Sequence, residues 1–350
     1  MDTNISTKSL KILLASFIFI VVSTLMSCSE NNYSKDLSNI SLKMESNRFE
    51  QKLFNCKSVN DIIDLSITDS NFYNTFTEYI IASNVQFPGA KNEDVAVELY
   101  KYISHQDMDS LYKISQKTFE DFQSYLDEFL EASKYILYYF PEDTINGVTT
   151  FISTFQYGAL YDQKSKKFGI GLDMYLGSDF EVYTLLNPEN FPLYRIKKFE
   201  PYRIVPNCIQ TYVEAKVPAY TPSTFIDQAI YEGKKLYILD LLLPNLHDSL
   251  KINYISGQLE WCEYQEENIW SYLVQEDELF NSDKNEIQKK YFNDGPFTTP
   301  FGNESSPRTG AWVGWQIVRS YMKNHHEISV KQLLSNTDHL IIFNQSGYRP

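Results

Sequence analysis

Residues 148–155 read VTTFISTF and residues 167–176 read KFGIGLDMYL. Both segments are rich in β-branched and aromatic side chains, which favour extended strands over helices. We therefore expect them to form neighbouring strands of a small sheet in the middle of the chain.

The segments on either side of these strands show the periodicity of helices. Phe122, Leu126 and Leu130 fall on one face of the stretch 119–140, which Pro141 ends. After Pro201 the pattern predicts helices over 201–215, 223–243, 262–281, 307–323 and 329–345. Ser329, with Gln332 three residues later, fits a capping box that opens the last of them. The predicted fold class is therefore α+β and mostly helical, with a short sheet in its middle.

The predicted helix 307–323 carries an apolar stripe. Its large side chains are Trp312, Trp315, Val318 and Met322. Packing in the core is the favoured interpretation, and an exposed groove for a partner protein is the alternative.

The N-terminus carries the signs of export and lipidation. Lys8 and Lys11 precede an apolar run that begins at Ile12 and is short for a membrane span of ~20 residues. The run ends in Leu25-Met26-Ser27-Cys28, which resembles a lipobox. We expect cleavage before Cys28 and acylation of that cysteine by palmitate-type chains, two or more of which anchor a protein stably. The alternative is an ordinary N-terminal membrane anchor with a chance cysteine.

Beyond this motif the sequence indicates one domain. Residues 29–44 are rich in Ser and Asn, as in a tether. No repeat of 20–50 residues and no second linker follows. We therefore predict a signal peptide over 1–27, a lipidated cysteine with a flexible tether over 28–44, and a single globular domain over 45–350.

Composition limits the partners. The chain is 43% hydrophobic and 15% aromatic, enough for a substantial core. Lys and Arg number 31 against 45 Asp and Glu, a net charge of −14 that argues against nucleic acid and against an anionic membrane surface. Cys56, Cys208 and Cys262 remain besides Cys28; buried free thiols are favoured, and one disulfide is the alternative.

Several segments together resemble the gliding-motility lipoprotein family GldB. In chain order they include Arg48-Phe49-Glu50, Ile170-Gly171-Leu172-Asp173-Met174-Tyr175-Leu176-Gly177-Ser178-Asp179, Glu232-Gly233-Lys234, Asp294-Gly295-Pro296-Phe297, Ser306-Pro307-Arg308-Thr309-Gly310 and Gly314-Trp315-Gln316-Ile317-Val318-Arg319. The resemblance implies a cell-envelope lipoprotein of the gliding machinery or, in a non-gliding organism, of some more general envelope task. Its implied partners are membrane lipid, through acylated Cys28, and other gliding or envelope proteins. The implied location is the outer membrane, facing the periplasm.

That family is in turn distantly similar to predicted zinc-dependent proteases of the gluzincin type. In those proteins a helix carrying His-Glu-x-x-His precedes a helix whose Glu-Gly supplies the third zinc ligand. The similarity implies a degenerate gluzincin-like fold here, with the first helix at 206–214 and the second at 223–233. Glu232 would correspond to the third ligand.

The sequence lacks the histidines that such a zinc site needs. A catalytic zinc site of this type needs two histidines at i and i+4 of one helix, with a glutamate beside the first. The five histidines are His105, His247, His325, His326 and His339, so the helix before Glu232 carries none. We therefore expect no bound metal and no cofactor.

The favoured function is a non-catalytic component or scaffold of gliding-related envelope machinery, in effect a pseudoenzyme. One alternative is a peptidase or hydrolase with a nonstandard site around Asp173, Glu214 and Glu232. Another is a module that binds a peptide or glycan in the ancestral cleft.

Overall fold

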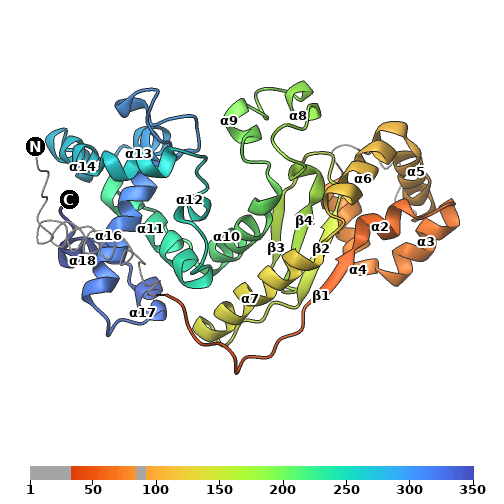
Figure 1. Ribbon diagram of the computed structural model, residues 1–350, viewed down its shortest axis with the longest axis horizontal. Helices are drawn as coiled ribbons and strands as arrows, with labels where there is room; N and C mark the ends of the chain where they lie inside the picture. Colours follow the sequence, from red (N-terminus) through yellow and green to blue (C-terminus); the bar gives the residue numbers. More distant parts are fainter. Residues whose placement is uncertain (1–32, 83–84, 86–91) are drawn as a thin grey trace, which may run out of the picture. The chain divides into compact units, whose positions relative to one another are not determined.

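The computed structural model describes residues 33–82, 85 and 92–350 (Figure 1). The predicted signal peptide 1–27 and the predicted lipidation site Cys28 lie outside the described residues. The chain divides into two compact units, residues 1–35 and 36–350, and all described helices and strands belong to the second. Residues 36–44 contain no helix or strand, although Leu37 is buried, and the first strand begins at Glu45.

The sheet contains four strands among the described residues. Their order is β1 (Glu45–Arg48), β2 (Gly147–Phe151), β4 (Lys167–Gly171) and β3 (Ala159–Asp162). β1 runs parallel to β2 and β2 parallel to β4, whereas β3 is antiparallel to β4. The two predicted strands are therefore confirmed as neighbours, with Thr150 opposite Ile170. β1 and β3 were not predicted from the sequence.

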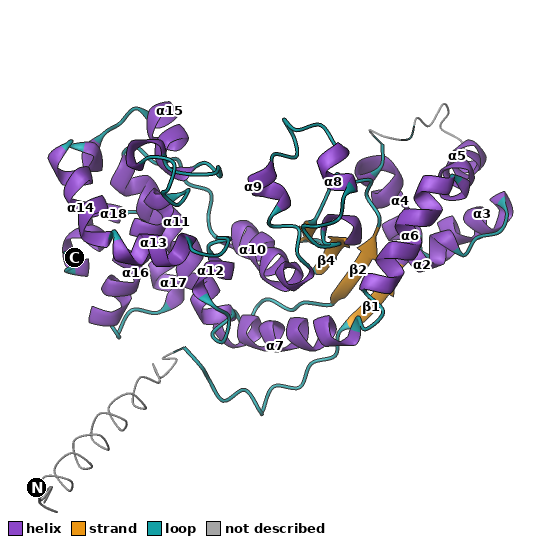
Figure 2. Cartoon of the chain, turned by 45° about the horizontal axis from the view of Figure 1, so that its top comes forward, coloured by secondary structure: helices purple, strands orange, loops and turns teal. Residues whose placement is uncertain are grey.

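Helices cover both faces of this sheet, so β2 is buried along its whole length. On one face Phe168 stacks on Phe129 of α7 (Gln123–Tyr139), and Tyr161 meets Tyr212 of α10 (Ile204–Lys216) edge to face. On the other face Phe151 belongs to an apolar cluster built by the N-terminal helices. Figure 2 shows α7 and α10 on one side of the strands and α2 to α6 on the other.

Both predicted strands end earlier than expected, and hydrogen bonds to Asp173 account for the end of β2. The predicted ends were residues 155 and 176, but β2 ends at Phe151, and β4 gives way at Gly171 to the 3-10 helix η2 (Leu172–Met174). The Asp173 carboxylate accepts hydrogen bonds from the backbone N–H groups of Ser153 (2.9 Å) and Phe155 (2.5 Å). These bonds hold a turn in which Thr154 and Phe155 have φ of 54° and 63°, a left-handed conformation that no strand allows.

The remaining elements are helices. In chain order they are α2 (Phe49–Phe54), α3 (Val59–Thr68), α4 (Ser70–Thr75), η1 (Phe76–Ile80), α5 (Asn92–Ser104), α6 (Gln106–Thr118), α8 (Val182–Leu185), α9 (Leu193–Ile196), η3 (Pro201–Arg203), α11 (Phe225–Leu242), α12 (Asp248–Lys251), α13 (Gln258–Tyr264), α14 (Glu266–Gln275), η4 (Glu278–Phe280), α15 (Lys284–Ile287), η5 (Gln288–Phe292), η6 (Thr299–Phe301), α16 (Thr309–Asn324), α17 (Val330–Ser335) and α18 (His339–Ser346). The helices predicted over 201–215, 223–243 and 307–323 correspond to η3 with α10, to α11 and to α16. The domain is thus α+β and mostly helical, as predicted.

Two predicted helices are wrong as single elements. The stretch 262–281 divides into α13, α14 and η4. The backbone leaves the helical conformation at Gln265, between α13 and α14, and at the left-handed Asp277 (φ 54°), before η4. The stretch 329–345 divides into α17 and α18. Asn336 lies between them, and its carbonyl oxygen accepts a hydrogen bond from the Lys234 ammonium. Asp338 caps α18, because its carboxylate accepts a hydrogen bond from the Ile341 N–H. The capping box of Ser329 and Gln332 is present at the start of α17.

The core of the C-terminal half forms where α11 crosses α16. A Cβ added to Gly314 would lie 1.7 Å from the Ala229 carbonyl oxygen, so the backbones touch at a point that only glycine permits. Trp312 and Trp315 of α16 are buried, at 2% and 0% exposure, which agrees with the core interpretation of the apolar stripe.

Candidate ligand site

Asp173, the first of the three predicted carboxylates, is a buried structural group. It is completely buried, and its oxygens are occupied by Ser153 and Phe155, as described above. Burial raises its pKa to about 6, although the hydrogen bonds from Phe155 and Ser153 act in the opposite direction. The carboxylate therefore holds a turn of the backbone at the end of the sheet.

Glu214 and Glu232, the other two, are brought together by a lysine. The ammonium of Lys235 lies 2.8 Å from Glu214 Oε2 and 3.2 Å from Glu232 Oε1. The second oxygen of Glu232 lies 4.0 Å from Nη2 of Arg308. Glu214 belongs to α10, whereas Glu232 and Lys235 belong to α11. These are the two helices that the protease resemblance had singled out. The Lys235 ammonium therefore lies between the two carboxylates.

The histidines do not join this group. His247 caps α12 and contacts Ser249, and His339 contacts Asp227 and Lys234. Among the described residues, no three His, Cys, Asp or Glu side chains are grouped so that they could hold a metal ion. The described cysteines are free thiols; Cys208 and Cys262 are buried, while Cys56 is partly exposed.

A pocket of about 240 Å³ lies close to this helix pair, between the end of the sheet and the loops of the C-terminal half. Its lining residues are Gly158, Met174, Tyr175, Arg195, Lys198, Phe199, Asn207, Asn253 and Asp294. The Lys198 ammonium donates a 2.6 Å hydrogen bond to Asp294, and Asn207 donates to the Tyr175 hydroxyl at 3.1 Å. The walls thus combine charge, amide groups and apolar surface, the mixture that is usual in sites for small ligands.

Two arginines fix the loop 252–254 that forms part of the pocket wall. Arg203 donates to the Asn253 side chain (2.8 Å) and to the Tyr254 carbonyl (2.6 Å), and Arg308 donates to the Ile252 carbonyl (3.1 Å). Asn253 and Arg308 both have left-handed backbone conformations, at φ 60° and 55°. Such conformations persist only where the surroundings enforce them, which is common around binding sites.

Segments that carry the family resemblance meet at this pocket. Met174 and Tyr175 belong to the segment 170–179, and Asp294 begins 294–297. Arg308, in the segment 306–310, links the pocket loop to Glu232. The sequence analysis missed Arg195, Lys198 and Arg203, and the available signal was the density of basic residues over 195–203 in an acidic chain.

A second polar cluster joins α11 to α18. His339 Nδ1 lies 2.5 Å from Asp227 Oδ1, and its Nε2 lies 3.0 Å from the Lys234 ammonium. Burial and the nearby Lys234 lower the pKa of His339, whereas Asp227 opposes the change. Burial also lowers the pKa of Lys234 to about 8. This cluster borders a hollow of about 370 Å³, but its histidine and lysine are 4% and 2% exposed, so it ties the helices together from within.

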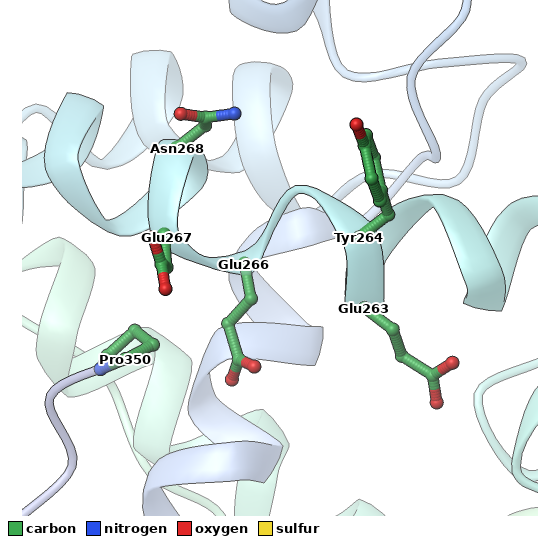
Figure 3. Close-up of a pocket in the computed structure, with 6 residues that line it drawn as sticks. All are labelled: Glu263, Tyr264, Glu266, Glu267, Asn268 and Pro350. Carbon is green, nitrogen blue, oxygen red and sulfur yellow. The ribbon is translucent and has the colours of Figure 1, made fainter.

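A third hollow has the opposite charge. Glu263, Glu266 and Glu267 of α13 and α14 line a surface groove of about 450 Å³ together with Pro350. Figure 3 shows these residues as sticks. Tyr348 donates a 2.8 Å hydrogen bond to Glu266. Burial, and then the neighbouring Glu260 and Asp248, raise the pKa of Glu263. This groove is lined by carboxylates, whereas the pocket around Lys198 is lined by Arg195, Lys198 and the single carboxylate of Asp294.

The fold and the site define a mostly helical α+β domain with a cationic pocket. Among the described residues, no helix is both long enough and apolar enough to cross a membrane. In a comparison with known families, residues 30–350 match one family model. The model is described as gliding motility protein GldB, and its label marks a lipoprotein family. The chain therefore belongs to the GldB family, whose name associates it with gliding motility and with lipoproteins of the cell envelope. No curated protein and no solved structure shows significant similarity to it, so the likeness to gluzincin-type proteases has no support from these comparisons.

Proposed function

We propose that this chain is a non-catalytic component or scaffold of gliding-related machinery, held on the periplasmic face of the outer membrane by acylated Cys28. Membership of the GldB family supports the association with gliding and with the envelope. The lipobox Leu25-Met26-Ser27-Cys28, which stands directly before the matched region, supports the lipid anchor.

The observation that carries the non-catalytic part is the position of Lys235. Two carboxylates at 2.8 and 3.2 Å already pair with its ammonium, and a divalent metal would have to displace it. The helix pair keeps the glutamates of the proposed ancestral site but uses them in an ion pair.

The alternative hydrolase around Asp173, Glu214 and Glu232 finds less support. Asp173 is completely buried and bonded to the turn 153–155, while the two glutamates share Lys235, and Arg308 lies near Glu232 alone. Acid–base catalysis requires its groups to reach one substrate. Asp173 and the glutamate pair therefore have separate partners and lie in separate parts of the structure.

Crosslinking in the native envelope tests the proposal. We expect the wild-type protein to crosslink to a defined set of envelope proteins and to incorporate labelled palmitate. Cys28→Ala should lose the label and the crosslinks, whereas Glu232→Gln, which keeps the shape of the side chain, should retain both.

Metal analysis of the purified full chain tests the catalytic alternative. Near-stoichiometric zinc that resists dialysis, or peptide hydrolysis that Glu232→Gln abolishes, would overturn the non-catalytic proposal. An unlabelled wild type would overturn the lipid anchor instead.

A further inference from the structure

We propose that the pocket around Lys198 binds a small organic carboxylate, of the size of one sugar acid or one acylated amino acid. This inference is independent of the scaffold proposal, since a scaffold and an enzyme could equally carry such a site.

Charge is the first argument. Arg195 and Lys198 line the pocket against the single carboxylate of Asp294, so the lining carries a net charge of about +1 in a chain whose net charge is −14. A monoanion neutralises this lining. A phosphate dianion would place excess negative charge beside Asp294, which is why we infer a carboxylate.

The state of Lys198 is the second argument. The residue is 8% exposed, and its ammonium has three N–H donors, one of which Asp294 engages. Burial, and to a smaller extent Arg308 and Arg203, lower its pKa, while Asp294 opposes the change. A ligand carboxylate would accept a further hydrogen bond and offset the repulsion from the two arginines.

Arg203, which holds the pocket loop 252–254 but does not itself line the pocket, gives a supporting observation. Arg203 is 3% exposed, and its Nε has no hydrogen-bond acceptor among the described residues, although its other nitrogens bind the loop 252–254. Buried guanidinium donors are normally satisfied, so this atom marks an excess of donors over acceptors next to the pocket.

The walls and the volume limit the rest of the ligand. Met174 and Phe199 offer apolar contact, and the amides of Asn207 and Asn253 can bind hydroxyl or amide groups. About 240 Å³ is less than the roughly 300–1,000 Å³ typical of pockets for drug-sized molecules. The body of the ligand is therefore small and partly polar.

Binding to the purified full chain in detergent tests this proposal with two carboxylates and their neutral counterparts. The probes are glucuronate against glucose, and N-acetylalanine against N-acetylalaninamide, followed by calorimetric titration or by ligand-observed NMR. We expect at least one carboxylate to bind saturably and its neutral counterpart not to bind. Which of the two binds distinguishes a sugar acid from a peptide-like acid.

Three variants locate the site. Lys198→Met and the more exposed Arg195→Met should each weaken binding by roughly tenfold or more, because each removes a charged hydrogen-bond donor. Lys197→Met is the matched control, since Lys197 is an exposed neighbour and loses the same charge. It should bind as the wild type does. Arg195→Met keeps the test valid if Lys198→Met unfolds.

Three results would overturn the proposal. They are the failure of both carboxylates to bind, binding of inorganic phosphate but of neither carboxylate, and an equal loss of affinity in Lys197→Met and Arg195→Met.

Discussion

Gly233 of α11 and Gly314 of α16 face each other so closely that a Cβ on Gly233 would lie 2.2 Å from the Gly314 carbonyl oxygen. The Glu232-Gly233 pair, which the protease resemblance presents as part of a metal motif, thus contains a glycine needed for helix packing. Two helices can cross at this distance only if neither carries a side chain at the crossing point.

Substitution of Gly314 should destabilise the fold strongly. Gly314→Ala should lower the free energy of unfolding by about 3 kcal/mol or more, since the new methyl group meets rigid backbone that cannot move aside. Denaturant unfolding measures the change. Gly295→Ala is the control, because a Cβ there would lie 3.7 Å from its nearest neighbour and should cost less than about 1 kcal/mol. Equal effects of the two substitutions would show that the crossing is not tight.

The ion pair of Lys235 should contribute to stability more than a surface pair does. The Lys235 side chain is 12% exposed and that of Glu232 17%, whereas Glu214 is 46% exposed. Lys235→Met leaves the largely buried Glu232 with a 3.4 Å hydrogen bond from Gln228 and with Arg308 at 4.0 Å, and should lower the free energy of unfolding by about 1–3 kcal/mol. Glu214→Gln should cost less than about 1 kcal/mol, because its exposed carboxylate is solvated by water. Thermal unfolding of both variants checks the order, and a larger loss in Glu214→Gln would contradict it.

Local patterns predicted much of the fold. The β-branched run at 148–151 identified β2, and the capping box at Ser329 identified the start of α17, because both depend on neighbouring residues alone. β1 escaped prediction because its four residues, Glu45–Arg48, have no strand composition. Pairing with β2, about a hundred residues away in sequence, makes them a strand.

The candidate site depends even more on distant contacts. Glu214 and Glu232 were singled out together, and the structure does join them, but through Lys235, which no motif indicated. The pocket around Lys198 unites residues from 158 to 294, and its wall depends on the left-handed Asn253. Tertiary contacts impose that conformation, so sequence periodicity carries no trace of it.

Acid should weaken the link between α11 and α18. The pKa of His339 is lowered below its usual 6.5 in the folded protein, so between that lowered value and about 6.5 the unfolded state binds more protons. This contribution to stability is present above about 6.5 and is lost as the pH falls below it. Lys234 is one cause of the lowered pKa, so Lys234→Met should lose less stability than the wild type between pH 7 and 5. An unchanged slope in Lys234→Met would contradict this account.

Asp173 should make the protein more stable as the pH falls, the opposite of the effect of His339. This pH dependence separates its structural role from a catalytic one. Its pKa is raised from 3.8 to about 6 by burial, so between these values the folded state binds more protons than the unfolded state. Its contribution to stability therefore rises as the pH falls from about 6 to 4, by about 3 kcal/mol in total for a shift of this size. Asp173→Asn should remove this rise.

The variant should also lose about 1–3 kcal/mol at pH 7, because its amide N–H₂ would face the Phe155 or Ser153 N–H where a carboxylate oxygen now accepts. Urea unfolding across the pH range checks both effects, with the exposed Asp179→Asn as the control. A variant with wild-type stability and the wild-type pH slope would show that the turn at 153–155 does not depend on Asp173, and its burial would then need a functional explanation.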